Sequence, residues 1–461
     1  MKEKILQTLH ELRKYALGKG YEVTLDYHEE DSSLMRFANS AISLNTNEHL
    51  IRLSITAYEG RKRASYDLIT DLGKLDDMKK GVDTAAEMVK HAQPLEYQPT
   101  IPTLKESFAD ESGYDAGLSN LENKEKLDYF NRAVQGMESD VIKLSGIFAN
   151  GTSSIAQANT RSEHTQFFRW SDAQATVVLS NEKLKWEIQS EQSAHVKSAL
   201  DPESAHQALT VLLDRYQHDE PQSLPLGRYD IVFGSAAIAD VLNVTNWIGI
   251  SGGSMKRGFS MIGEDKVGQK VLSDQVTLVD DPTLVETFPY RRDLMGMPRS
   301  RFPFFEKGIF SGFAWFQDDA DEFGAKPTGH TVMHKSLALQ GGEMDLANVE
   351  ALIQMKRETD LLYIPFLHYM NIVNPSKGVI TASSRFGALY LKKDGSVVIP
   401  YNVRLTQSIL DIFGDKVAWL SKQTEPYNTS VSYGPRNPTA IIVPRFLCVR
   451  DLEISHSNTS Y

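Results

Sequence analysis

The sequence predicts an α+β fold in two domains: an N-terminal domain of antiparallel sheets with helices, and a C-terminal β-rich domain that is barrel-like or sandwich-like. Three observations lead to this prediction. Runs that alternate apolar and polar residues dominate both halves, helical apolar stripes stand between them, and a polar segment with two prolines occupies residues 218–226. The chain of 461 residues also exceeds the usual length of one domain. We therefore expect domains over residues 1–225 and 226–461.

The N-terminal half begins with a helix, because apolar residues recur at helical spacing in its opening segment. Four alternating runs then predict an antiparallel meander; they are residues 21–28, 33–45, 50–60 and 62–68. A tight hairpin is expected to begin at Glu59-Gly60. Alternation places Met35, Phe37 and Ala41 on one face that we expect to be buried. An apolar stripe over 74–92 predicts the next helix.

A second group of strands follows a helix that is expected near residues 124–138. Its four alternating runs are residues 140–150, 151–160, 164–180 and 183–195. Asn150-Gly151 stands between the first two runs and predicts a hairpin, because this dipeptide suits turns with positive φ. Asp201 then caps an expected helix, whose residues Ala205, Leu209 and Leu212 face one way.

The C-terminal half opens with a short buried strand at residues 229–233, and a helix is expected at 236–247. Strand-like runs fill most of the remainder: residues 270–281, 302–316, 361–373, 377–384, 386–400 and 439–455. One further helix is expected near residues 348–358. Many short strands separated by Gly and Pro turns are typical of a barrel or a sandwich.

Composition argues against several classes of protein. The formal net charge is −11, whereas a nucleic-acid surface needs clustered excess Lys and Arg. The sequence has no apolar run long enough to span a membrane and no secretory signal pattern at its start. We therefore expect a cytoplasmic protein with neither a nucleic-acid nor a membrane partner. Cys448 is the only cysteine, which excludes a disulfide framework within the chain.

Residue chemistry alone identifies no catalytic group. The sequence contains neither HExxH nor HExxxH. His330 and His334 would form a candidate metal site if their segment were helical, but the alternation around them favours a strand, in which they would lie about 13 Å apart. Cys448 is expected to be a buried strand residue. The pair Asp280-Asp281 precedes Pro282 and is typical of a turn, although it could also supply acid or base groups.

Six segments, in order along almost the whole chain, resemble signature segments of the TldD/PmbA peptidase family. They are RFANSAI (36–42), IFANGTSSIAQANTR (147–161), GRYDIVFGSAAIADVL (227–242), LVDDPTL (278–284), FEKGIFSGF (305–313) and SRFGALYLKKDGSVVIPYNVRLTQSILDIF (384–413). The resemblance implies a role in the proteolysis of unfolded or modified peptides, carried out in a dimer with another subunit.

The chain departs from the family's peptidase subunit at one motif. In that subunit, the helix after the YDIVF-like strand carries HExxxH, which holds zinc together with a later cysteine. The matching positions here are Asn243, Val244 and Ile248, which neither bind Zn²⁺ nor activate water, and Cys448 does not match the family's cysteine motif. The resemblance therefore implies the PmbA (TldE) type, with no catalytic residue or cofactor in this chain and with zinc in a TldD-like partner.

Two other functions remain open from the sequence. One is a homodimeric binding or scaffold protein without any hydrolytic role. The other is a hydrolase that uses His330, His334 and His368. Whether the chain is itself an enzyme is not decided by these residues.

The favoured interpretation expects peptide contact after the helix at 236–247. Trp247 offers an apolar wall there, and Gly249, Gly252 and Gly253 permit a close backbone approach. A glycine turn that is packed by a core tryptophan explains the same residues equally well. The sequence leaves both interpretations of this loop open.

Overall fold

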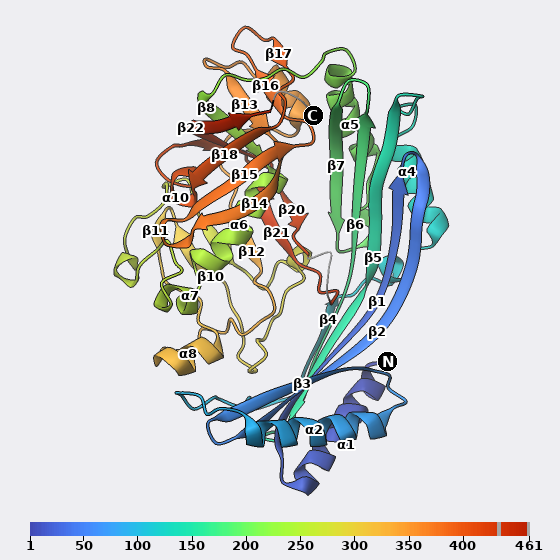
Figure 1. Ribbon diagram of the computed structural model, residues 1–461, viewed down its shortest axis with the longest axis vertical. Coiled ribbons are helices and arrows are strands. Elements are labelled where there is room, and N and C mark those ends of the chain that lie inside the picture. Colours follow the sequence, from blue (N-terminus) through green and yellow to red (C-terminus); the bar gives the residue numbers. More distant parts are fainter. Residues whose placement is uncertain (431–434, 459–461) are drawn as a thin grey trace.

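Helices and strands occur throughout the computed structural model, which describes residues 1–430 and 435–458 (Figure 1). The strands form three sheets of seven, six and nine strands. All strands up to residue 194 belong to the first sheet, and those from residue 227 onward form the other two. This arrangement confirms the predicted α+β class.

The seven-stranded sheet is built on four long strands that run through the whole N-terminal half (Figure 1). Its strands are β1 (Glu22–Ala38), β2 (Ala41–Glu59), β3 (Lys62–Thr70), β4 (Phe108–Gly113), β5 (Ile142–Asn159), β6 (Gln166–Asn181) and β7 (Trp186–Ala194). Their order is β3-β2-β1-β5-β6-β4, and β7 also pairs with β6. The pairings are antiparallel except for that of β4 with β6. The pairing of β1 with β5 joins the two predicted groups of strands into one sheet.

Helices cover the two ends of this sheet and form two separate cores. At one end, α1 (Lys2–Lys19) and α2 (Leu75–His91) pack on Leu25, Tyr27 and Ile55. At the other end, α4 (Asn123–Ala133) and α5 (Pro202–Tyr216), with the short α3 (Ala116–Ser119), adjoin a core that includes Met35 and Phe37. The helices of the described residues include none that is long and apolar enough to cross a membrane.

Two predictions for this sheet were wrong, one of a continuous strand and one of a turn. The run at 33–45 contains a hairpin at Asn39 and Ser40, whose φ angles are 50° and 61°, so Ala41 lies beyond the turn and is exposed. Asn150 and Gly151 form no hairpin but lie inside β5. Glycine is needed at 151 because a Cβ there would lie 2.2 Å from the backbone oxygen of Asp31 on the neighbouring strand. The hairpin after Glu59 is confirmed.

The six-stranded sheet has the order β11-β10-β9-β12-β21-β20. Its strands are β9 (Leu278–Asp280), β10 (Phe302–Glu306), β11 (Ile309–Phe310), β12 (Leu337–Leu339), β20 (Thr424–Asn428) and β21 (Ala440–Pro444). The nine-stranded sheet has the order β14-β15-β18-β22-β8-β13-β16-β17, and β19 also pairs with β22. Its strands are β8 (Gly227–Gly234), β13 (Leu361–Ile364), β14 (Phe366–Asn374), β15 (Val379–Arg385), β16 (Leu389–Leu391), β17 (Val397–Val398), β18 (Val403–Ser408), β19 (Val417–Leu420) and β22 (Phe446–Ser457).

The two C-terminal sheets share one apolar core with helix α6 (Ser235–Ile248). Phe304 and Ile441 enter it from the smaller sheet, and Phe233 and Leu447 from the larger. Over the described residues both sheets keep two open ends, so the barrel alternative is not realised. The other helices of this half are α7 (Gly252–Lys256), α8 (Gln317–Phe323), α9 (Val349–Gln354) and α10 (Ile409–Ile412).

The two halves of the chain are joined by packing and by one inserted segment. The core around Phe37 also contains Phe446 and Cys448 of the C-terminal half. Residues 435–438 reach across to the N-terminal sheet, where the Arg436 guanidinium donates to both carboxylate oxygens of Asp172, at 3.0 and 2.7 Å. The Arg436 carbonyl accepts from Ser153 Oγ at 2.6 Å. These contacts hold the halves in one arrangement.

Candidate functional site

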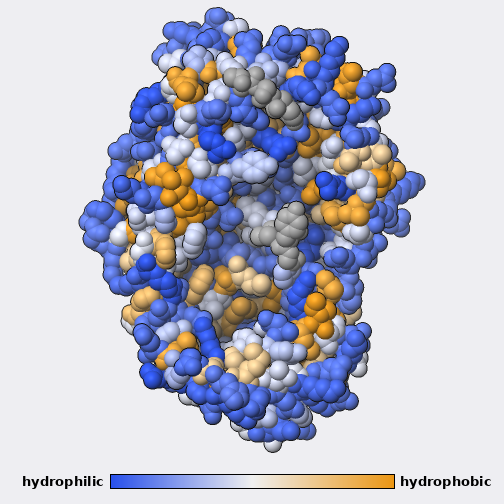
Figure 2. Space-filling view, in the orientation of Figure 1, coloured by the Kyte–Doolittle hydropathy of each residue, from blue (hydrophilic) through white to orange (hydrophobic). Residues whose placement is uncertain are grey.

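Helix α6 lies in the C-terminal half, where it enters the core that the two C-terminal sheets share (Figure 1). It packs against β8, β14, β20 and β21, and its buried face includes Val241, Leu242 and Ile248. Asn243 and Trp247 lie on the opposite, exposed face, because residues four apart share one side of a helix. Figure 2 shows that the face of the molecule in this view is hollowed near its centre.

A cavity of about 350 Å³ lies beside α6. Asn243 and Asn246 line it from the helix, and Lys335, Asn437 and Thr439 line it from the segments before β12 and β21. Its size falls within the range of about 300–1,000 Å³ that small-molecule sites occupy. Its polar groups include amide side chains, two threonine hydroxyls, His334 and Lys335, so the cavity offers hydrogen-bond donors and acceptors.

Lys335 is a buried cation in the wall of this cavity. Its side chain is 5% exposed, and burial lowers the pKa of its amine to about 8. Nζ donates to Asn246 Oδ1 at 2.8 Å and lies 5.0 Å from the centre of the Phe316 ring. The lysine therefore titrates close to neutral pH while it stays fixed to α6. Sequence reasoning missed it, because nothing in the alternating run TVMHKSLAL reveals that a lysine is buried.

Two carboxyl groups near α6 also titrate near neutrality. Glu191 on β7 accepts hydrogen bonds from Gln174 at 2.8 Å and from Gln189 at 3.1 Å, and the Tyr427 hydroxyl lies 3.4 Å away. Burial raises the pKa of Glu191 to about 7 and that of Asp240 on α6 to about 7. The Glu191 charge further raises the pKa of Asp240. No local pattern in the sequence indicates this pair, because its members come from different halves of the chain.

The histidine pair of the sequence analysis has separate partners. His330 Nδ1 lies 2.7 Å from Thr328 Oγ1, and its Nε2 lies 3.1 Å from Asp280 in a buried ion cluster with Arg299. His334 Nε2 donates to the Phe288 carbonyl at 2.8 Å, and burial lowers its pKa to about 4. Each ring thus serves its own local hydrogen bonds.

The third histidine of the hydrolase alternative lies in the nine-stranded sheet. His368 is on β14, and its Nδ1 lies 3.4 Å from an Arg385 guanidinium nitrogen. It has no bonding partner in common with His330 or His334 among the described residues. The Asp281 side chain accepts from the Thr283 amide at 3.0 Å and so forms the predicted turn.

The tryptophan in the last turn of α6 and the glycines that follow the helix have different environments. Trp247 is 54% exposed, and Gly249 is buried at the helix end. A Cβ at Gly252 would lie 2.5 Å from the Trp315 ring, and one at Gly253 would lie 2.1 Å from the Asp319 carboxylate. The Gly252 amide already donates to the Ala314 carbonyl at 2.9 Å. A peptide-binding role for these four residues stays a prediction.

The side chains at the family's zinc positions do not fit a zinc ion. Asn243 offers a neutral amide, Val244 offers no donor, and Ile248 is buried in the core. Cys448 is buried on β22, and burial raises the pKa of its thiol to about 12, so it carries no thiolate near neutral pH. These side chains therefore do not provide the donor set of a zinc site at α6.

Comparisons with known proteins agree with this architecture. A family model described as the PmbA/TldA metallopeptidase C-terminal domain matches residues 226–456. The chain is similar to the crystal structure of TldE from Thermococcus kodakarensis, with a TM-score of 0.79, 17% identity, and coverage of 97% of this chain and 100% of that one.

Two further solved structures, both of putative modulators of DNA gyrase, are similar. The one from Thermotoga maritima has a TM-score of 0.73 and 16% identity, and covers 97% of this chain and 99% of that one. The one from Bacteroides thetaiotaomicron has a TM-score of 0.73 and 16% identity, and the match covers 97% of this chain and 98% of the Bacteroides chain. No curated protein matches the sequence significantly. At these identities the structural likeness shows a common fold over 97% of the chain.

Proposed function

Because this chain belongs to the TldD/PmbA family, we propose that it is a PmbA/TldE-like subunit of a metallopeptidase complex that degrades unfolded or modified peptides in the cytoplasm. The zinc ion resides in a TldD-like partner. The donor set of α6 carries this proposal, because Asn243, Val244 and Ile248 replace the metal-binding and catalytic side chains.

The subunit contributes a peptide-binding surface to the complex. An extended peptide exposes amide N–H and C=O groups at every residue, and the Asn243 and Asn246 side chains can pair with both kinds. Lys335 adds a cationic donor for a carbonyl or a terminal carboxylate. Contacts with the peptide main chain carry little sequence preference, which suits a substrate that is defined by its lack of structure.

The experiment that tests the proposal is reconstitution. The chain is used as bait in a pull-down, and an HExxxH-bearing partner that is identified by mass spectrometry is purified and mixed with it. We expect hydrolysis of a flexible peptide by the mixture alone, and its loss when the partner's metal is chelated. Hydrolysis by this chain by itself that survives a chelator would overturn the proposal. A stable homodimer that captures no such partner would favour the scaffold alternative.

A variant of the cavity tests the peptide surface. Lys335→Met removes the amine but keeps the length of the side chain, and we expect it to raise the KM of the complex by about tenfold, the loss of one charge-assisted hydrogen bond. Lys326→Met, at an exposed position, is the matched control and should leave KM unchanged. An equal effect of both variants would remove the cavity from the substrate path.

A further inference from the structure

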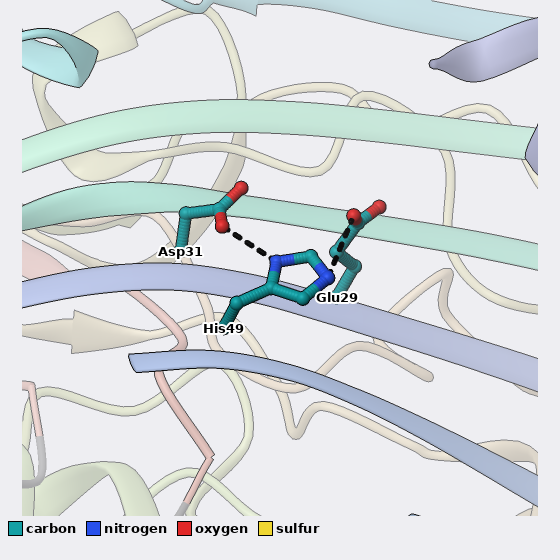
Figure 3. Close-up of side chains that lie close together, drawn as sticks. All are labelled: Glu29, Asp31 and His49. Carbon is teal, nitrogen blue, oxygen red and sulfur yellow. Dashed lines mark hydrogen bonds and ion pairs between the residues drawn. The ribbon is translucent and has the colours of Figure 1, made fainter. Parts of the chain in front are cut away.

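Three side chains that could bind a metal ion converge on the N-terminal sheet, far along the chain from α6 (Figure 3). Glu29 and Asp31 lie two residues apart on β1 and therefore point to the same face of the sheet. His49 on β2 is the direct cross-strand partner of Asp31. One ligand atom from each of the three lies within 4.8 Å of the others.

The two nitrogens of His49 face different carboxylates. Nδ1 lies 2.6 Å from Asp31 Oδ1, and Nε2 lies 3.8 Å from Glu29 Oε1. The second distance is too long for a hydrogen bond. It can be spanned by one ion, because bonds from zinc to histidine nitrogen and to carboxylate oxygen measure about 2.0–2.2 Å each.

Glu29 supplies the second observation that points to a ligand. Its side chain is 4% exposed, and its Oε2 accepts from the Tyr27 hydroxyl at 3.0 Å. Oε1 is buried and has no hydrogen-bond partner among the described residues, although an unpaired buried carboxylate oxygen is costly. The oxygen that lacks a partner is the one that faces His49.

The surroundings favour a cation that enters from solvent. The Asp31 and His49 side chains are 60% and 52% exposed, so one side of the cluster is open. Asp71 adds a further negative charge nearby. The cation facing the cluster from β6 is Arg169, which stacks on the Tyr114 ring at 3.8 Å and forms no ion pair with Glu29 within 4.0 Å.

We propose that Glu29, Asp31 and His49 form a site for a divalent transition-metal ion such as Zn²⁺. Glu29 Oε1 and His49 Nε2 are the direct protein ligands, water completes the coordination, and Asp31 accepts the Nδ1 hydrogen and so orients the ring. Imidazole with carboxylate is a donor set that suits first-row divalent metals. When the ion binds a protonated His49, the Nε2 proton is released to solvent, and the Nδ1 hydrogen stays on the ring and is donated to Asp31.

The site is distinct from the α6 region, so it leaves the proposed division of labour in the peptidase complex unchanged. An ion there would tie β1 to β2 in the stretch between the two helix-covered ends of the sheet. It would bind the folded chain in preference to the unfolded one, because the three side chains are brought together only by the strand pairing.

The test is a metal titration of the full chain after treatment with a chelator. Zn²⁺ is added at pH 7.5 against a chromophoric competitor, and Co²⁺ is added in parallel for its absorption spectrum. We expect one equivalent to bind, with proton release and with weaker binding at pH 5.5. We also expect Zn²⁺ to raise the unfolding temperature of the wild type. Absence of saturable binding would show that His49 forms an imidazolium ion pair only, and would overturn the proposal.

Variants assign the site to its residues. Losing an orienting carboxylate costs about 10–100-fold in metal affinity, so we expect that loss for Asp31→Asn and a loss beyond about 100-fold for Glu29→Gln and His49→Asn. His91→Asn is the control, because His91 also lies beside a glutamate, Glu87, at 3.3 Å, but on the exposed surface of α2. Each variant's unfolding is measured without metal to establish that it folds. Unchanged Zn²⁺ binding by His49→Asn would place the ion elsewhere and refute the assignment.

Discussion

Replacing Arg436 should loosen the connection between the two halves of the molecule. The guanidinium makes two hydrogen bonds to Asp172, whose side chain is 4% exposed, whereas that of Arg436 is 17% exposed. Removing one member of a buried pair costs about 3–5 kcal/mol, because the other charge is left without compensation. Since Arg436 retains some contact with water, we expect about 3 kcal/mol for Arg436→Met.

The assay is a double-mutant cycle with Arg436→Met, Asp172→Asn and the combined variant, measured by urea unfolding. We expect the combined variant to recover about 2 kcal/mol of the summed single losses. Burial raises the pKa of Asp172 even with Arg436 present, so removing the arginine raises it further. The isolated carboxyl then takes up a proton as the pH falls, and the cost of Arg436→Met should be smaller at pH 5 than at pH 8. A coupling energy below about 0.5 kcal/mol, typical of an exposed ion pair, would refute this reasoning.

Three further predictions follow from packing and burial. Phe37→Ala should destabilise the chain by about 3–5 kcal/mol, because Phe37 is buried and its ring centre lies 4.4 Å from that of Phe130. The control is Ile42→Ala at its exposed cross-strand neighbour. Equal effects of the two variants would contradict the core assignment. Glu191→Gln should stabilise the chain by about 1–3 kcal/mol at pH 8. The raised pKa of Glu191 favours folding below pH 4.5, where the group is protonated, and that advantage is lost as the pH rises through about 7. Denaturant unfolding measures the gain, and a gain that does not shrink toward pH 5 would be contrary evidence. Gly252→Val should lower the free energy of unfolding by about 1–3 kcal/mol through overpacking against Trp315, and an unchanged free energy would mean that the loop has room for a ligand.

Local sequence signals predicted most helices and one hairpin of this fold. The apolar stripe at 74–92 and the Asp201 cap correspond to α2 and α5, and the cap is visible as a hydrogen bond from the Ser204 amide at 3.1 Å. Such signals depend only on neighbouring residues. The hairpin at Asn39-Ser40 was missed because it contains no glycine, although both residues have positive φ.

Long-range proximity could not be predicted from the same signals. The role of Gly151 depends on the approach of β1, which is distant in sequence, and so its dipeptide was misread as a turn. At the candidate site, the family resemblance located α6 and its missing ligands. Lys335, Glu191 and Asp240 were missed because their pKa values depend on burial by residues from several elements.

The position of β8 in the nine-stranded sheet has a consequence for the folding of the chain during its synthesis. β8 is the first strand of the C-terminal half to be synthesised, yet one of its two neighbours is β22, the last. Until β22 emerges, β8 keeps an unpaired edge in the nascent chain, and such an edge invites pairing with other chains. The sheet can therefore be completed only after translation has reached Ser457. A chain that stops shortly before Phe446 would lack β22 and would expose this edge of β8, so we expect the truncated product to aggregate or to be retained by chaperones.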